Sequence, residues 1–214
     1  MTYGHVRDRV LQLLNQYTVA GTHVAASYNN QQDYLNKIPG LVNDAMLEIA
    51  TTMRKIPAFF ILDANGDYEE FGNWAKFELP ENFYQFLTGE TFLTTQEGYT
   101  FHTNLYRYQG RNYLLVPKKE LEHGGRYTIT YYRYPTPLSD TPNATDELDN
   151  VPETHTAIPF YVAAFLVIHD DSFLYASFYN KYEDKLQKLL PDVRAEARPV
   201  DDVYNVWTGW VYDS

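Results

Sequence analysis

Residues 151–190 read VPETHTAIPFYVAAFLVIHDDSFLYASFYNKYEDKLQKLL. The first half holds the longest uncharged apolar run of the chain, residues 157–168, which predicts a helix that is buried on all sides. The polar sequence HDDS at 169–172 then interrupts the run. Beyond it the apolar residues return at a spacing typical of a two-faced helix, at positions 174/175, 178, 182, 186 and 189/190. The stretch therefore predicts a helical hairpin.

Local signals mark the ends of these two helices. Thr154 or Thr156 is expected to cap the first, because a hydroxyl oxygen there accepts hydrogen bonds from unpaired backbone N–H groups. Pro159 falls in the first turn, where its missing N–H group costs nothing. Asp171 or Ser172 is expected to cap the second helix.

Two further helices are predicted near the N-terminus. Residues 3–17 carry apolar side chains at three- and four-residue spacing, and residues 40–55 repeat this pattern. Pro39-Gly40 is expected to interrupt the second pattern and to leave residues 31–38 as a separate short turn.

The hydrophobic period changes from about 3.6 to 2 at Ile56-Pro57, which predicts strands. The strongest strand candidate is RYTITYYRY at 126–134. Asn65-Gly66 predicts a hairpin between strands at 59–62 and 68–71, because both turn residues tolerate positive φ. A second hairpin turn is predicted at Gln109-Gly110-Arg111-Asn112, and a long acidic, proline-rich connection follows at 135–153.

These patterns predict an α+β protein with a discontinuous helical bundle. Residues 1–56 and 135–190 form the bundle, and residues 57–134 form an inserted, mainly antiparallel β domain. Residues 191–214 are predicted to form an extended C-terminal arm, since no helical period continues after Pro199.

Composition excludes several classes of protein. The 214 residues contain no cysteine, which rules out a disulfide-built fold and thiolate chemistry. The 12-residue apolar run is shorter than the ~20 residues that span a bilayer. The first residues, MTYGHVRDRVLQLL, carry charges where a secretion signal needs an apolar run. A net charge of −11 argues against a protein that binds nucleic acid by neutralising phosphates.

The candidate metal sites have simpler interpretations. The segment Asp63-Ala-Asn-Gly-Asp67 places glycine at position 4 instead of position 6 of a calcium loop, and position 12 is Trp74. His155, His169 and Asp170 lack the spacing of metal ligands, and the last two fit the tip of the helical hairpin.

Catalytic signatures are also lacking. Glu97, His102 and His123 have no nucleophilic serine in a strained turn nearby. The chain contains no glycine-rich phosphate loop. We therefore expect a protein that is not an enzyme and that uses neither a cofactor nor a metal.

The C-terminal segment combines many apolar side chains with little periodicity. Residues 199–214 contain three acidic groups and no basic group. Aromatic side chains in such a segment favour docking on a partner. The predicted anchors are Tyr204, Trp207, Trp210 and Tyr212. The alternative is that these aromatics fold back on the chain's own core, which is the commonest fate of apolar residues.

One combination of elements resembles a known family. A strand ending in YYRYP, an acidic connection, ELDNVPE, an apolar helix, HDD and FYNKYEDKLQKL occur in this order over residues 131–190. This order resembles the head-to-tail adaptor (connector) proteins of tailed bacteriophages, and the helix pair before a β insertion is also similar. The β segment of roughly eighty residues is larger than in the minimal members of that family.

The resemblance implies a structural virion protein at the head–tail interface, made in the host cytoplasm. Copies of such proteins assemble into a ring, usually of twelve, below the portal, and a tail or stopper protein docks on the ring. Genomic DNA passes through the ring without specific binding, and no membrane is involved. An acidic chain suits such a channel wall, because like charges repel.

Two rival functions come from other classes. The tyrosine- and tryptophan-rich β segment could stack on sugars, as in a receptor-binding or carbohydrate-binding module, and an exposed aromatic platform would favour that reading. An enzyme with scattered catalytic residues would instead show a deep pocket with convergent perturbed carboxylates or histidines.

Overall fold

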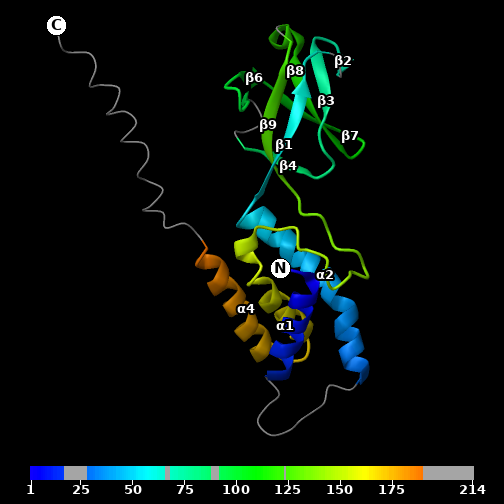
Figure 1. Cartoon of the computed structure of the whole chain (residues 1–214), viewed down its shortest axis with the longest axis vertical. Helices are drawn as coiled ribbons and strands as arrows, with labels where there is room; N and C mark the ends of the chain where they lie inside the picture. Colours follow the sequence, from blue (N-terminus) through cyan, green and yellow to red (C-terminus); the bar gives the residue numbers. More distant parts are fainter. Residues whose placement is uncertain (17–27, 66–67, 88–91, 123, 190–214) are drawn as a thin grey trace, which may run out of the picture. The chain divides into compact units, whose positions relative to one another are not determined.

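The computed structural model describes residues 1–16, 28–65, 68–87, 92–122 and 124–189, and Figure 1 shows the order of their elements. The described residues form an α+β fold with four α-helices and antiparallel sheets, so the predicted fold class is confirmed. The helices are α1 (Tyr3–Gln16), α2 (Tyr28–Thr52), α3 (Ile158–Val167) and α4 (Ser172–Gln187). The strands are β1 (Ile56–Asp63), β2 (Glu69–Phe71), β3 (Trp74–Glu78), β4 (Phe83–Phe86), β5 (Phe92–Thr94), β6 (Thr100–His102), β7 (Asn104–Tyr108), β8 (Arg111–Pro117) and β9 (Arg126–Arg133).

The chain divides into two compact units. The helical unit contains residues 1–42, 142–146 and the chain from residue 152 onward. The β unit contains residues 43–141 and 147–151. The division therefore falls once within α2 and three times within the connection that precedes α3.

Helix α3 lies at the centre of the helical unit and packs against both α1 and α4. Its side chains are apolar all round, and Val162, Ala163 and Ala164 are completely buried. Helix α4 turns a narrower face inward, on which Phe178 and Tyr182 are 0% and 1% exposed. The predicted hairpin of one buried helix and one two-faced helix is therefore present.

The caps of this hairpin are only partly as predicted. The Asp171 carboxylate accepts hydrogen bonds from the backbone N–H groups of Phe173 and Leu174, both at 2.9 Å, and caps α4. The threonine cap predicted for α3 is wrong. Thr154 ends a short 3-10 helix, and its backbone carbonyl accepts from the N–H group of Ala157, which leads into α3 without a side-chain cap.

The first turn of α1 is capped by the connection instead of by a side chain. The backbone N–H groups of Tyr3 and Gly4 donate to the carbonyls of Asp146 and Ala144, at 2.8 and 3.0 Å. A Cβ atom on Gly4 would lie 2.7 Å from the Ala144 carbonyl oxygen, so only glycine fits this approach. The acidic connection is thereby fixed to the start of the chain.

Helix α2 runs through Pro39, so the predicted break between 31–38 and 40–55 is wrong. A proline inside a helix removes one hydrogen bond and costs ~3 kcal/mol. Completely burying an apolar side chain contributes about 1.5–3 kcal/mol. The burial of one helix face offsets the cost of Pro39, since five side chains of α2 are 0% exposed: Ile38, Val42, Ala45, Met46 and Ile49.

The β unit contains one sheet in the order β1-β9-β4, a second in the order β2-β3-β8-β7, and the pair β5-β6. Strand β1 pairs with β9 from Ile56↔Arg133 to Asp63↔Arg126, and β2 pairs with β3. The hairpin predicted across Asn65-Gly66 is therefore wrong. The predicted hairpin at 109–112 is present, but its turn is limited to Gln109 and Gly110, which both have positive φ, because Arg111 and Asn112 already pair with β7.

One continuous hydrophobic core lies inside the β unit. Alternation along β3 and β9 supplies part of it, since their inward side chains are buried and the neighbours are not, whereas β8 has three consecutive buried residues at 114–116. Its members include Leu62, Phe77, Phe83, Phe86, Leu93, Phe101, Leu114, Tyr127, Ile129 and Tyr131.

An ion pair ties the end of β9 to the acidic connection. The guanidinium of Arg133 donates two hydrogen bonds of 2.5 Å to the carboxylate of Asp149. The backbone N–H group of Thr136 donates a third hydrogen bond to that carboxylate, at 2.7 Å. The hydrogen bonds from Arg133, followed by those from Thr136, hold the pKa of Asp149 well below its usual range.

We expect Asp149→Asn to lower the free energy of unfolding by about 2 kcal/mol at pH 7, because charge-assisted hydrogen bonds are lost. The folded pKa of Asp149 lies below the unfolded value of about 3.9, so this stabilisation is complete above that pH and is lost progressively below it. Urea denaturation at pH 7 and at low pH measures the difference.

The matched control is Asp140→Asn, because Asp140 is an exposed carboxylate in the same connection. It should change stability by less than about 0.5 kcal/mol. Equal losses for the two variants, or a loss for Asp149→Asn that persists unchanged at low pH, would contradict the assigned ion pair.

Candidate partner-binding surface

The predicted anchors Tyr204, Trp207, Trp210 and Tyr212 lie outside the described residues. Their role in docking stays a prediction. His123 also lies outside the described residues. Among the candidates that the structure describes, most make structural contacts, and His102 lines a hollow on the β unit.

The histidines of the helical unit serve different local structures. His155 is buried, and its Nδ1 atom lies 3.0 Å from the N-terminal amine of Met1. His169 is exposed in the turn between α3 and α4, so the ten residues of α3 separate the two rings. Within the described ranges, no group of three or more histidine, cysteine or acidic side chains is arranged to hold a metal ion.

The acidic candidates of the β unit support turns. Asp63 accepts a hydrogen bond from the backbone N–H group of Asn65 at 2.9 Å and pairs with Arg126 at 2.7 Å. These contacts, that with Arg126 first, lower the pKa of Asp63. Glu97 accepts from the backbone N–H group of Thr128, which lowers the pKa of Glu97.

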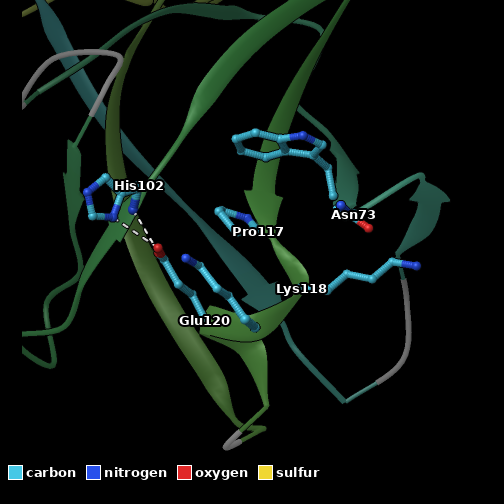
Figure 2. Close-up of a pocket in the computed structure, with 7 residues that line it drawn as sticks. Asn73, His102, Pro117, Lys118 and Glu120 are labelled. Atoms are coloured by element: carbon cyan, nitrogen blue, oxygen red, sulfur yellow. Dashed lines mark hydrogen bonds and ion pairs between the residues drawn. The ribbon is translucent and has the colours of Figure 1, made fainter.

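A hollow of about 590 Å³ opens beside the start of β3 and the end of β8. Figure 2 shows His102 and Glu120 turned toward each other on one side of it and Lys118 extending away on the other. We name it the Trp74 cleft after the half-buried indole in its lining. Its lining residues are Asn73, Trp74, His102, Pro117, Lys118, Lys119 and Glu120.

Backbone pairing fixes the walls of the cleft. Trp74 and Pro117 are register partners of β3 and β8, so their side chains lie on the same face of the sheet. The N–H group of Lys118 donates to the carbonyl of Asn73 at 3.0 Å and extends this pairing.

Glu120 holds the far wall of the cleft, because its carboxylate lies 2.8 Å from the backbone nitrogen of His102 and 2.9 Å from its Nδ1 atom. Lys118 pairs with Glu70 at 2.7 Å. Lys119 is exposed and makes no ion pair with any other residue that the structure describes. The cleft thus combines an apolar wall with the exposed cation of Lys119 and the carboxylate of Glu120.

Aromatic rings continue along the same face of the sheet. Phe71 stands opposite Trp74 in the register, and its ring centroid lies 5.6 Å from that of Tyr106. Tyr106 also lies 6.2 Å from both Tyr108 and Tyr113. Phe71 and Tyr108 are 47% and 51% exposed, so this aromatic face is open to a partner.

Strand β1 offers a second apolar surface. In the described sheets it is an edge strand, paired only with β9. Pro57, Phe59 and Ile61 alternate on its outward face, and Phe59 and Ile61 are 67% and 59% exposed. Contiguous exposed apolar side chains of this kind mark interaction surfaces.

Sequence reasoning missed the Trp74 cleft and the aromatic face. Their residues come from strands between positions 71 and 120 that only the register brings together. One pair of the aromatic face could have been found from the sequence. In a hairpin whose turn is Gln109-Gly110, counting residues outward from the turn places Tyr106 opposite Tyr113.

The described helices include none that is long and apolar enough to cross a membrane. A search of curated proteins finds no match to the chain. The model of the SU10 adaptor protein family matches residues 1–204, which cover the whole β unit and most of the helical unit. This match spans nearly the whole sequence, and the chain therefore belongs to the SU10 adaptor protein family.

Proposed function

We propose that this protein is a head-to-tail adaptor whose copies form a ring between the portal and the tail. The proposed ring holds twelve copies, the usual number in head-to-tail adaptors. The observation that carries the proposal is the family match over residues 1–204, which makes the chain a structural adaptor of a phage virion. In this proposal residues 1–56 and 135–190 build the ring as a bundle, 57–134 form an inserted domain, and 191–214 form a docking arm.

Surface chemistry supports assembly with other virion components. The apolar side chains on β1 and the aromatic face leave large hydrophobic residues in water, where a partner would bury them. A ring joins copies head to tail, so each copy needs two different complementary surfaces. The portal and a tail or stopper protein are the further partners, and the ring surrounds the channel through which DNA passes.

The direct test is to measure the mass of the purified protein by light scattering and to image it with and without the portal protein of the same phage. A closed ring, formed alone or on the portal, is the expected result. A protein that stays monomeric and fails to bind the portal would contradict the proposal.

We expect the protein not to retain duplex DNA, even at low salt where electrostatic binding is strongest. The physical reason is the net charge of −11, which repels phosphates and suits a channel wall past which DNA slides. A gel mobility assay across a salt series measures the binding. Tight binding that weakens steeply with salt would contradict the channel role and favour a nucleic-acid-binding protein.

One observation favours a second candidate function, that of a carbohydrate-binding module. The aromatic face presents exposed rings, those of Phe71 and Tyr108, as a sugar-stacking surface requires. Calorimetric titration with polysaccharide from the host surface separates the two functions. Binding that is lost in Tyr108→Ala, by a protein that forms no ring, would favour the module.

A further inference from the structure

The Trp74 cleft has the properties of a receptor for a peptide segment. Its volume of about 590 Å³ lies within the range of ~300–1,000 Å³ found for ligand sites. Trp74 and Pro117 provide an apolar wall that paired strands hold in place. At the rim, Lys119 is an exposed cation without an ion pair among the described side chains.

Residues 199–214 of the same chain have the complementary chemistry. They contain Trp207 and Trp210, which are two of the three tryptophans of the protein; the third is Trp74 in the cleft. Their charged groups are Asp201, Asp202 and Asp213, all acidic. An indole can fill the apolar part of the cleft while a carboxylate a few residues away meets Lys119.

The length of the chain permits this contact between copies. Residues 190–207 lie beyond the described part of α4 and its end, and 18 residues can span at most roughly 60 Å when extended. A head-to-tail ring requires one donor surface and one different acceptor surface on each copy. The acidic aromatic segment and the apolar cleft with the exposed Lys119 form such a pair.

We propose that the Trp74 cleft of one copy receives the segment Trp207–Trp210 of the neighbouring copy. Trp207 and Trp210 are the anchors, and Lys119 pairs with the acidic group at Asp201 or Asp202. The inference rests on the proposed ring and deepens it, because it names the acceptor for the arm. It also gives the inserted β unit a role, as the part of each copy that holds the next copy's arm.

Cross-linking tests the contact cleanly, because the chain has no cysteine of its own. A tagged Lys119→Cys chain is co-expressed with an untagged Thr208→Cys chain, and the purified protein is oxidised with copper phenanthroline. The matched control replaces the first variant by Glu81→Cys, an exposed site of the same β unit outside the cleft lining.

We expect about tenfold more mixed disulfide dimer with Lys119→Cys than with Glu81→Cys, because a disulfide needs Cα atoms within ~7 Å. An excess of synthetic peptide 199–214 should lower the dimer yield. The same peptide with alanine at both tryptophan positions should not. Equal yields from the two cysteine sites, or no mixed dimer, would overturn the assignment of the cleft.

The mass of the assembly shows whether a failed cross-link contradicts only the cleft as acceptor or also the proposed ring. A closed ring without the mixed dimer overturns the acceptor assignment and leaves the adaptor ring intact. The absence of both the ring and the dimer overturns both. A third outcome is that residues 199–214 resist proteolysis only when portal protein is added and that no mixed dimer forms. This outcome would assign the arm to the portal and overturn the cleft as its acceptor.

Discussion

Phe178→Ala should lower the free energy of unfolding by about 3–5 kcal/mol, the largest loss that we expect from a single substitution. The Phe178 side chain is 0% exposed on the inward face of α4, beside Tyr182, and α4 packs along α3. Truncation removes the transfer free energy of the ring and leaves a cavity that the surrounding helices fill only in part. Urea denaturation followed by circular dichroism at the helical band measures the loss.

Phe173→Ala is the matched control on the same helix. It removes the same ring from a side chain that is 79% exposed, so it should change stability by less than about 0.5 kcal/mol. His169→Ala, in the exposed turn before α4, should be similarly mild. Equal losses for Phe178→Ala and Phe173→Ala would show that the inward face of α4 is misassigned.

The choice of Phe178 shows what an apolar run can and cannot predict. Phe165 lies within the apolar run 157–168, which predicts a buried helix, but its side chain is only half-buried. Its ring lies 4.5 Å from that of Tyr161 and 5.8 Å from that of Tyr175. A helix that is apolar all round carries no periodic signal for its most buried side, whereas the two-faced α4 does.

Features that depend on local periodicity were predictable. The change of period at Ile56-Pro57 coincides with the start of β1, and the strand predicted at 126–134 is β9. The capping carboxylate of Asp171 also acts within three residues of its own position. In each case the interactions that decide the structure lie within a few positions of the residue.

Features that depend on distant pairing were not predictable. Asn65-Gly66 favours a local hairpin, but β1 gains a partner in β9, beginning with Asp63↔Arg126. That pairing buries Leu62 and Ile129 in the core of the β unit, which a two-stranded hairpin could not do. The threonine cap expected for α3 fails for a different, local reason, because the 3-10 helix Pro152–Thr154 leads the chain into α3.

The candidate site likewise has one part that the sequence predicts and one part that depends on distant pairing. The docking role of the C-terminal aromatics follows from composition and stays a prediction, because those residues lie beyond the described part of the chain. The Trp74 cleft forms only when β3, β8 and His102 come together. Its lining residues extend from Asn73 to Glu120, which are 47 positions apart in the sequence. Composition alone points to the C-terminal segment as the part that docks, whereas the cleft that would receive it is found only from the strand register.

Deleting residues 199–214 should leave a folded protein that no longer joins its ring or the portal. The helical and β units each bury apolar side chains among the described residues, so we expect the melting temperature to change by no more than a few degrees. A buried tryptophan anchor contributes ~2 kcal/mol or more to an interface. Losing Trp207 and Trp210 together should therefore weaken assembly roughly a thousandfold.

The measurement is a comparison of melting temperature and assembly mass between the truncated and the complete chain. A chain that lacks only Asp213 and Ser214 is the control, because it keeps both tryptophans and should assemble normally. If the truncated protein unfolds, the C-terminal aromatics belong to the chain's own core, as the alternative from the sequence holds. If it folds and still forms the ring on the portal, the arm has no part in assembly, and the exposed apolar side chains of β1 become the surface to substitute next.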